Sequence, residues 1–284
     1  MRWAGLAIQS FLGICLLAAL HCGAAGTAGA ESGLDPVEEA SGAAGAGDTR
    51  EGGPQRAYEY ARELLAAKDY PAAFRSMRDA AEHGHAEAQT ALGDMYRAGE
   101  GVAADDAEAF RWYARAAEQG DAEGRVNLGL MYADGQGVAR DDAEAVKWFR
   151  LAAESGDPAG QTYLGLMYLD GQGVEKNEAE AAIWLKKAAA DEEEALAQVT
   201  LGIMYAGGRG VPQDDAEAAR WYLGAAEQGN ALAQYHIGVS YAEGRGVDQN
   251  PKQALEWLSS AARQGLSQAK DYLAAMGSKT AKRK

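Results

Sequence analysis

The sequence predicts an all-α fold, a right-handed α/α solenoid of about six helix-turn-helix repeats with a C-terminal capping helix. The first observation is recurrence: the stretch LGLMYADGQGVARDDAEAVKWFRLAA at 128–153 returns with the same landmarks at starts 92, 164, 201 and 237. A fixed period of this size is typical of repeat architectures. The second observation is that apolar residues in each copy recur at helical spacing on both sides of a glycine-rich turn.

Residues 1–30 have the organisation of a secretory signal peptide. Arg2 precedes an apolar run over 6–20, and small residues at 22–30 follow, which is the order of regions in a cleaved export signal. Cleavage after Ala30 would place the mature protein in the periplasm or outside the cell. It would also remove both cysteines of the chain, so no disulfide framework is expected.

A retained membrane anchor is one alternative to cleavage after Ala30, although the apolar run is short for a span of roughly 20 residues. A lipoprotein signal is the other alternative. Such a lipoprotein would carry its lipid on Cys22, but His21 stands where these signals need a small residue. Residues 31–53 are rich in glycine and alanine, and they predict a disordered linker because they cannot bury enough apolar surface to offset the entropy of ordering. Residues 54–278 form the predicted repeat domain, and 279–284 form a basic tail.

The body of the chain is strongly acidic. Of 27 Lys and Arg residues and 42 Asp and Glu residues, 22 basic and all 42 acidic ones lie within 31–278, which gives this stretch a formal charge of −20. Such a surface repels nucleic acid and anionic lipid. The predicted partner is therefore a protein or peptide, with basic flanks where it complements the acidic surface. Membrane contact is expected only through the export signal or a lipid on Cys22.

Each unit is predicted to be a pair of antiparallel helices, as the copy at 128–153 illustrates. Its first helix runs from about Asp121 to Asp134 and stops at a G-x-G turn, because a tight helix exit needs the positive φ that glycine permits. Asp141 and Glu144 then predict a capping box at the start of the second helix, in which each side chain bonds the other's free backbone amide.

Two residues of every unit are predicted to be structural. A glycine in the middle of the first helix costs about 0.5–1 kcal/mol relative to alanine, so we expect the partner helix to approach too closely for a Cβ. One tryptophan in each second helix is expected to fill the space between the helices, because burying an indole is strongly stabilising. The glycines are Gly93, Gly129, Gly165, Gly202 and Gly238, and the tryptophans are Trp112, Trp148, Trp184, Trp221 and Trp257.

The repeated pattern LGxMYxxGxGVxxDxxEAxxWxxxAA resembles the SEL-one-like repeat (SLR) family, a branch of the tetratricopeptide-like α/α repeats. The resemblance covers about residues 55–276, and some dozen positions recur in register. It implies a solenoid with a curved inner face lined by the first helices, and a role as adaptor or scaffold in protein assemblies. Several bacterial members are exported and act in envelope signalling, secretion or polysaccharide export.

The ends of the array and one internal junction depart from the repeat. Residues 55–84 lack the G-x-G turn and predict an N-terminal cap, and the helix over 266–276 matches only a first helix, which predicts a C-terminal cap with a polar outer face. Between the third and fourth units the chain has one extra residue and the acidic run Asp191–Glu194 in place of a glycine. This run is either a tolerated insertion or an acidic contact or protease-sensitive kink.

The partner is expected on the inner face, near the leucine of each first helix. The predicted face is polar in the first unit and apolar in the middle units, with a rim of carboxylates, and it would suit a segment with apolar anchors and basic flanks. The alternative is that the curvature of the solenoid buries these side chains against the next repeat. The predicted inner-face residues are Asp94, Arg97, Val126, Leu130, Thr162, Leu166, Leu169, Val199, Ile203, Tyr235 and Val239, and the rim residues are Asp134, Asp170 and Glu243.

No catalytic residue, metal site or cofactor is predicted. Outside the signal peptide the histidines are His83, His85 and His236, and two of them in one turn lack the further ligands of a zinc site. The chain has no P-loop, HExxH or G-x-S-x-G motif. The leading interpretation is an exported, non-enzymatic scaffold. The alternatives are a cell-wall or β-lactam hydrolase, although the paired cysteines of relatives linked to β-lactam hydrolysis are missing, and an outer-membrane scaffold for polysaccharide export.

Overall fold

The computed structural model describes residues 53–191 and 194–281, and the regular secondary structure in these ranges is entirely α-helical. The predicted signal peptide, the cleavage site after Ala30, Cys22 and the linker up to residue 52 lie outside the described residues, as do the last three residues of the basic tail. Within the described ranges, no helix has both the length and the apolar character needed to cross a membrane.

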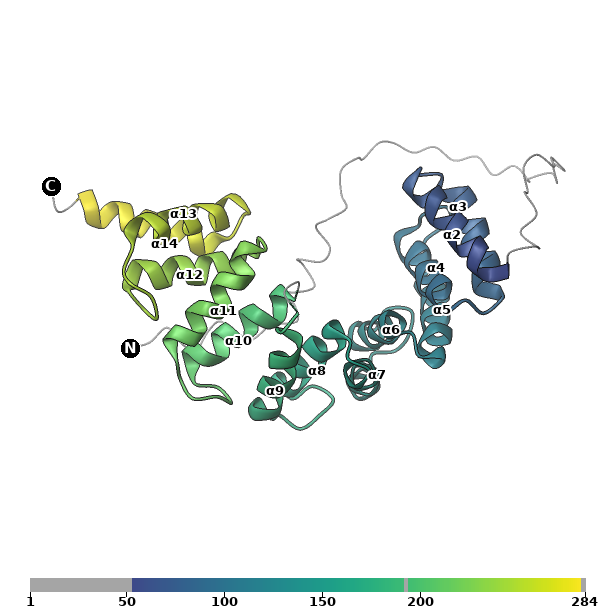
Figure 1. The fold of residues 1–284 in the computed structure, drawn as a ribbon, viewed down its shortest axis with the longest axis horizontal. Helices are drawn as coiled ribbons and strands as arrows, with labels where there is room; N and C mark the ends of the chain where they lie inside the picture. The colour runs from purple at the N-terminus through teal and green to yellow at the C-terminus, as the bar shows by residue number, and fades with distance from the viewer. Residues whose placement is uncertain (1–52, 192–193, 282–284) are drawn as a thin grey trace. The chain divides into compact units, whose positions relative to one another are not determined.

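Thirteen helices follow one another along the described chain, and each packs mainly on its neighbours in sequence (Figure 1). They form six pairs and a final single helix, so the predicted all-α solenoid is confirmed. We call α4, α6, α8, α10 and α12 the first helices and α5, α7, α9, α11 and α13 the second helices. The bounds are α2 Gly53–Ala66, α3 Tyr70–Glu82, α4 Ala86–Ala98, α5 Asp106–Gln119, α6 Ala122–Asp134, α7 Asp142–Glu154, α8 Pro158–Asp170, α9 Glu178–Ala188, α10 Ala195–Gly207, α11 Asp215–Glu227, α12 Ala231–Glu243, α13 Pro251–Arg263 and α14 Ser267–Ala281.

The two glycines of each G-x-G turn have different structural roles: the first ends the helix, and the second allows close contact with the preceding repeat. Gly135 ends α6 in the left-handed conformation, and its amide donates to the carbonyl of Met131. Gly137, with φ of 66°, lies so close to the carbonyl oxygen of Asp106 in the preceding second helix that a Cβ would overlap it. The corresponding overlap recurs in the other four turns. The second glycine therefore fixes each turn to the preceding repeat.

Of the predicted capping box, the structure contains the bonds to the aspartate side chain but not the return bond to the glutamate. Asp141 accepts hydrogen bonds from the amides of Ala143 and Glu144 at the start of α7, as predicted. Its own amide donates to the carbonyl of Tyr132 at the end of α6, over 2.9 Å, while the Glu144 carboxylate pairs with Lys147. The bond from the cap amide to a tyrosine carbonyl recurs in all five repeats. It satisfies the donor that the glutamate was expected to bond, and it ties the second helix to the first.

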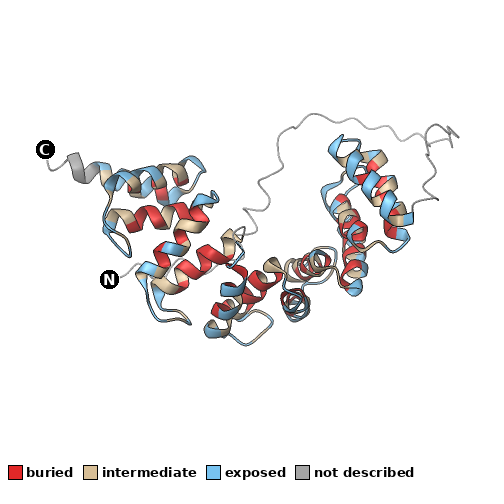
Figure 2. Ribbon diagram, viewed as in Figure 1, coloured by how far each residue is buried: buried red, intermediate tan, exposed pale blue. Residues whose placement is uncertain are grey.

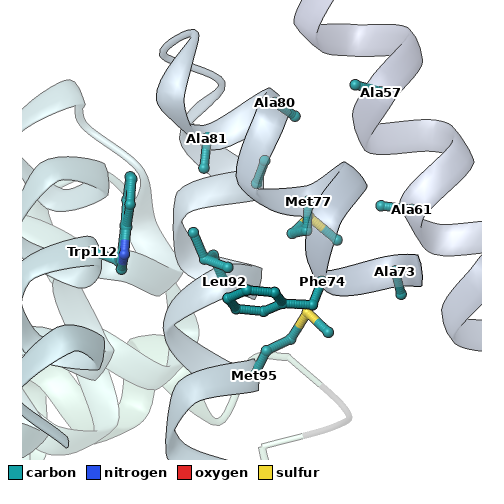
Figure 3. Close-up of a cluster of buried hydrophobic side chains, with 11 residues drawn as sticks. Ala57, Ala61, Ala73, Phe74, Met77, Ala80, Ala81, Leu92, Met95 and Trp112 are labelled. Atoms are coloured by element: carbon teal, nitrogen blue, oxygen red, sulfur yellow. The ribbon is translucent and has the colours of Figure 1, made fainter. Parts of the chain in front are cut away.

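The core is a series of apolar clusters shared between neighbouring helices. Buried residues occur in every pair of helices (Figure 2). In the N-terminal cluster, Phe74 and Met77 of α3 lie with Leu92 and Met95 of α4, and Trp112 of α5 joins them (Figure 3). Because each cluster draws on adjacent repeats, each repeat depends on its neighbours for burial.

The mid-helix glycines lie at the close approach that the sequence predicts. A Cβ on Gly129 would come within 2.6 Å of the Phe149 ring, and one on Gly202 within 2.5 Å of the Tyr222 ring. In every repeat the side chain that faces the glycine follows the tryptophan in sequence, and all five of these side chains are buried. They are Tyr113, Phe149, Leu185, Tyr222 and Leu258.

The tryptophans lie beside this contact, which corrects the expectation that they fill the space between paired helices. Only Trp112 is buried, and Trp148, Trp184, Trp221 and Trp257 are half-buried. A step of one residue turns about 100° around a helix, so a tryptophan next to the glycine-facing residue packs at the edge of the cluster instead. The four half-buried indoles cover the core rather than occupy its centre, whereas Trp112 belongs to the buried N-terminal cluster.

The C-terminal helix α14 differs from the first helices at the position of the mid-helix glycine. Ala274 in α14 stands at the position of the mid-helix glycine, and the outer residues Lys270, Asp271 and Ala274 are exposed. The alanine distinguishes α14 from the five first helices, which carry a glycine at this position. The helix runs to Ala281, past the predicted end at residue 276.

Candidate protein-binding surface

The predicted inner-face positions divide into a buried set and an accessible set. The buried side chains are those of Val126, Thr162, Leu166, Leu169, Val199 and Val239, and the accessible ones are those of Leu130, Ile203 and Tyr235, which are half-buried, and of Asp94 and Arg97, which are exposed. Burial against the next repeat, the stated alternative, therefore holds for the first set. The accessible set keeps the capacity to touch a partner.

The packing of Val126 and Val199 shows how this burial arises. Val126 belongs to a cluster with Phe149 of its own repeat and Leu164 of the next one. Val199 belongs in the same way to a cluster with Tyr222 of its own repeat. The position two residues before the leucine thus contributes to stacking between repeats. A substitution there would test stability rather than partner binding.

A threonine takes this position in two repeats and makes a polar link to the following repeat. The Thr90 hydroxyl donates to a carboxylate oxygen of Asp121 over 2.7 Å, and the same oxygen accepts from the amide of Gly124 at the start of α6. The Thr162 hydroxyl donates to the Glu194 carboxylate over 2.9 Å. The hydroxyl therefore links neighbouring repeats by a hydrogen bond and is not free for a ligand.

Asp94 is held in place from within the array. Its carboxylate accepts a hydrogen bond of 2.6 Å from the Tyr113 hydroxyl. Desolvation raises the pKa of Asp94, and the bond from Tyr113 and the charge of Arg97 oppose that rise. Burial and the neighbouring carboxylate also raise the pKa of Tyr113 well above its ordinary value. Asp94 is a fixed anion whose environment favours a nearby cation.

Three further carboxylates on the first helices lack a direct partner. Within the described residues, Glu123, Asp134 and Asp170 form no hydrogen bond or ion pair through their side chains. Desolvation raises the pKa of all three, and nearby carboxylates raise that of Glu123 further. The charges of Arg97 and Arg140 partly oppose the rise at Asp134, and those of Arg209 and Lys176 partly oppose it at Asp170. A cation placed beside them would remove an electrostatic cost that the free protein carries.

The rim residue Glu243 differs from the other two rim carboxylates. It accepts a hydrogen bond of 3.0 Å from the Tyr272 hydroxyl and pairs with Arg245 at 2.7 Å. The Tyr272 ring packs edge-on against Tyr235, with 6.4 Å between ring centroids. The acidic rim is therefore available at Asp134 and Asp170 and already neutralised at Glu243.

A row of buried glutamines was missed by the sequence prediction. The side-chain amides of Gln89, Gln161 and Gln234 donate to last-turn carbonyls of the preceding helix (α3, α7 and α11), at 3.0, 3.4 and 3.2 Å. The signal was present, because glutamine stands three residues before the leucine in four of the five first helices. Arg125 replaces it in α6 and reaches the carbonyls of Ala117 and Leu151.

The histidines have structural partners. His85 accepts from the amide of Ala88 at the start of α4, and its other ring nitrogen lies 2.7 Å from the amide oxygen of Gln55. His236 stacks on Tyr222, with 4.7 Å between ring centroids. Among the residues that the structure describes, no group of three or more His, Cys, Asp or Glu side chains could hold a metal ion.

Comparison with known families decides what this architecture is. The model of the Sel1 repeat matches residues 86–121, 122–157, 158–192, 195–230 and 231–266. The chain belongs to the Sel1 repeat family. Proteins with this repeat generally serve as scaffolds for protein–protein interaction. A search of curated proteins found no match.

Solved structures agree with the Sel1 assignment. A protective antigen of uropathogenic Escherichia coli with an SLR fold is 39% identical, covers 77% of this chain and superposes with a TM-score of 0.71. This chain spans only 48% of that antigen. A Sel1 repeat protein from Oxalobacter formigenes is 34% identical, with 75% of this chain and 84% of that one covered and a TM-score of 0.68.

Proposed function

We propose that this Sel1 repeat protein is an exported scaffold that binds a protein segment across the accessible side of its first helices. The observation that carries the proposal is the pairing of two kinds of side chain there. Leu130, Ile203 and Tyr235 offer apolar surface that the repeats leave half-exposed. The carboxylates of Glu123 and Asp134 are partly desolvated and have no direct partner among the described residues.

This combination favours a segment with apolar anchors and basic flanks. Burial of apolar anchors against this surface contributes favourable binding free energy because it removes them from water. A Lys or Arg beside the carboxylates adds to it, because the carboxylates are already partly desolvated and little further desolvation is needed to form the pair. The net charge of −15 supports the same preference over a longer range. Nucleic acid is not the proposed partner.

Export rests on the N-terminal sequence. The cation, apolar run and small residues of 1–30 support transport and cleavage after Ala30, and a periplasmic or secreted location follows from the proposal. Mass spectrometry of the mature N-terminus tests it, since a chain beginning at Glu31 is expected. A chain that keeps residues 1–30 in the cytoplasm contradicts export, and a lipid on Cys22 supports the lipoprotein alternative.

Selection from a random peptide library displayed on phage tests the binding chemistry. The enriched peptides should place Lys or Arg next to large apolar residues, and their affinity should fall with salt because the charges are screened. In fluorescence anisotropy, Ile203→Asp should weaken binding at least about tenfold, as expected for an apolar anchor. The matched control is Ile183→Asp on the second helix α9, where the side chain is already 50% exposed. Equal weakening by both variants, or enrichment without basic residues, refutes the proposed surface.

A further inference from the structure

The junction between α9 and α10 lacks two features of the other junctions between repeats. Elsewhere a glycine with φ between 90° and 98° follows the second helix or α3, as at Gly120 and Gly156, and no glycine occupies 189–194. At the start of each of the first helices α4, α6, α8 and α12, the N-cap side chain accepts a hydrogen bond from a first-turn backbone amide of that helix. Glu194, at the start of α10, makes no such cap bond.

The junction between α9 and α10 is also one residue longer than the other junctions. Four residues, 118–121, connect the paired alanines at the end of α5 to the start of α6, whereas five residues, 190–194, do so between α9 and α10. The second helix also ends early, because α9 has 11 residues and the other second helices have 13 or 14. The carboxylate that reaches the N-cap position is therefore a glutamate that points away from its own helix.

Glu194 links the two repeats instead of capping α10. Its carboxylate accepts from the Thr162 hydroxyl at 2.9 Å, and that hydroxyl lies at the same distance from the carbonyl of Pro158, so the two acceptors share one proton. At the equivalent link, Asp121 accepts from Thr90 and also caps α6. The polar link between α8 and α10 thus depends on one hydrogen bond to a carboxylate whose pKa is raised by desolvation. Leu169 of α8 also shares a buried cluster with Leu201 and Met204 of α10.

Stability in a repeat protein is approximately the sum of terms for single repeats and terms for their interfaces. A missing cap and a missing exit glycine both weaken this interface, and the ion pair between Arg209 and Glu178, which crosses it, offsets part of that loss. We propose that the junction between α9 and α10 is a joint at which the array opens into two cooperatively folded blocks, one that ends with α9 and one that begins with α10. Leu130 lies in the first block and Ile203 in the second, so the joint sets how the two parts of the accessible surface meet.

Hydrogen exchange followed by mass spectrometry on the full chain tests the joint. Peptides from α9 and α10 should exchange about tenfold faster than peptides from α6 and α7, since a difference of about 1.4 kcal/mol corresponds to tenfold. Thr162→Val should accelerate exchange in α9 and α10 about fivefold or more, because it leaves a half-buried carboxylate without its donor. Valine is tolerated at this position in α6 and α10.

Two further variants keep the result interpretable. Thr90→Val is the matched control and should accelerate exchange in α4 and α6 less than Thr162→Val does at the joint, because Asp121 keeps its bond to Gly124. Replacing 190–194 by Glu-Gln-Gly-Asp, the sequence of 118–121, should slow exchange in α9 and α10 to the rate of α6 and α7. Equal rates at both junctions in the unaltered chain, or no slowing in the repaired one, overturn the proposal.

Discussion

Replacing the glycine at the centre of α10 should separate two effects that are usually confused. In a helix, Gly→Ala normally stabilises by about 0.5–1 kcal/mol, because alanine loses less backbone entropy on folding. Gly207 near the end of the helix offers this case, since a Cβ there would meet only the flexible side chain of Arg209 at 3.5 Å. Gly207→Ala should therefore stabilise the protein.

Gly202→Ala in the same helix should do the opposite. The new Cβ would lie 2.5 Å from two ring carbons of Tyr222, which is 4% exposed and stacks on the His236 ring. Overpacking of this kind costs about 1–3 kcal/mol. After subtraction of the helix-propensity gain, the net loss should be about 1–2 kcal/mol, and the two variants should differ by about 2–3 kcal/mol.

Urea unfolding followed by circular dichroism measures this difference from the midpoints of the same transition in the two variants. The slope with denaturant should stay unchanged, so that a midpoint shift reports stability. If Gly202→Ala stabilises the protein as much as Gly207→Ala does, the close approach of α11 is not the reason for glycine at this position.

Two other predictions concern charge. Burial lowers the pKa of His236 from its ordinary 6.5 to about 4, so the stability from a neutral His236 is complete above pH 6.5 and is lost as the pH falls toward 4. Acidification from about pH 7 to 5 should lower the unfolding free energy of the unaltered chain by about 1–2 kcal/mol more than that of the His236→Tyr variant, which carries the residue found at this position in α8. If the urea midpoints of the two proteins shift equally between the two pH values, this prediction is wrong. Arg209 pairs with Glu178 of the preceding repeat at 2.9 Å, and Arg209→Ala should cost about 1 kcal/mol at low salt and less at high salt. The exposed pair of Arg220 and Glu217 should be worth less than about 0.5 kcal/mol, and equal costs for the two arginines would contradict the role given to burial.

Local signals allowed much of the fold to be predicted from the sequence. The helix predicted from about Asp121 to Asp134 is α6, with Asp121 as its cap and Gly135 as its exit. Caps and exit glycines act within a few residues of themselves, so their pattern is visible in the chain. The close approach of a partner helix at each mid-helix glycine was also predictable, because the same unfavourable residue recurs at this position in five helices.

The identity of the residue that faces this glycine was not predictable in the same way. Tryptophan is the larger side chain, and its recurrence suggested the centre of the core. The structure places Phe149, the next residue, against Gly129 and leaves Trp148 half-buried. Helix rotation decides this choice, and one residue changes it by about 100°. The fact that the following residue is aromatic or leucine in every repeat was the signal that could have resolved it.

Exposure on the first helices depends on how neighbouring repeats stack, which no single unit encodes. Leu130 and Leu166 are the same residue type at the same position, yet Leu130 is half-buried and Leu166 is 2% exposed. Leu166 lies in the repeat that precedes the altered junction between α9 and α10. An aspartate at 166 would therefore unfold a repeat, whereas one at 203 would alter a surface. Differences of this kind between copies of one unit decide which first-helix side chains are accessible, because the glycines and capping residues shared by the copies pack or cap the helices.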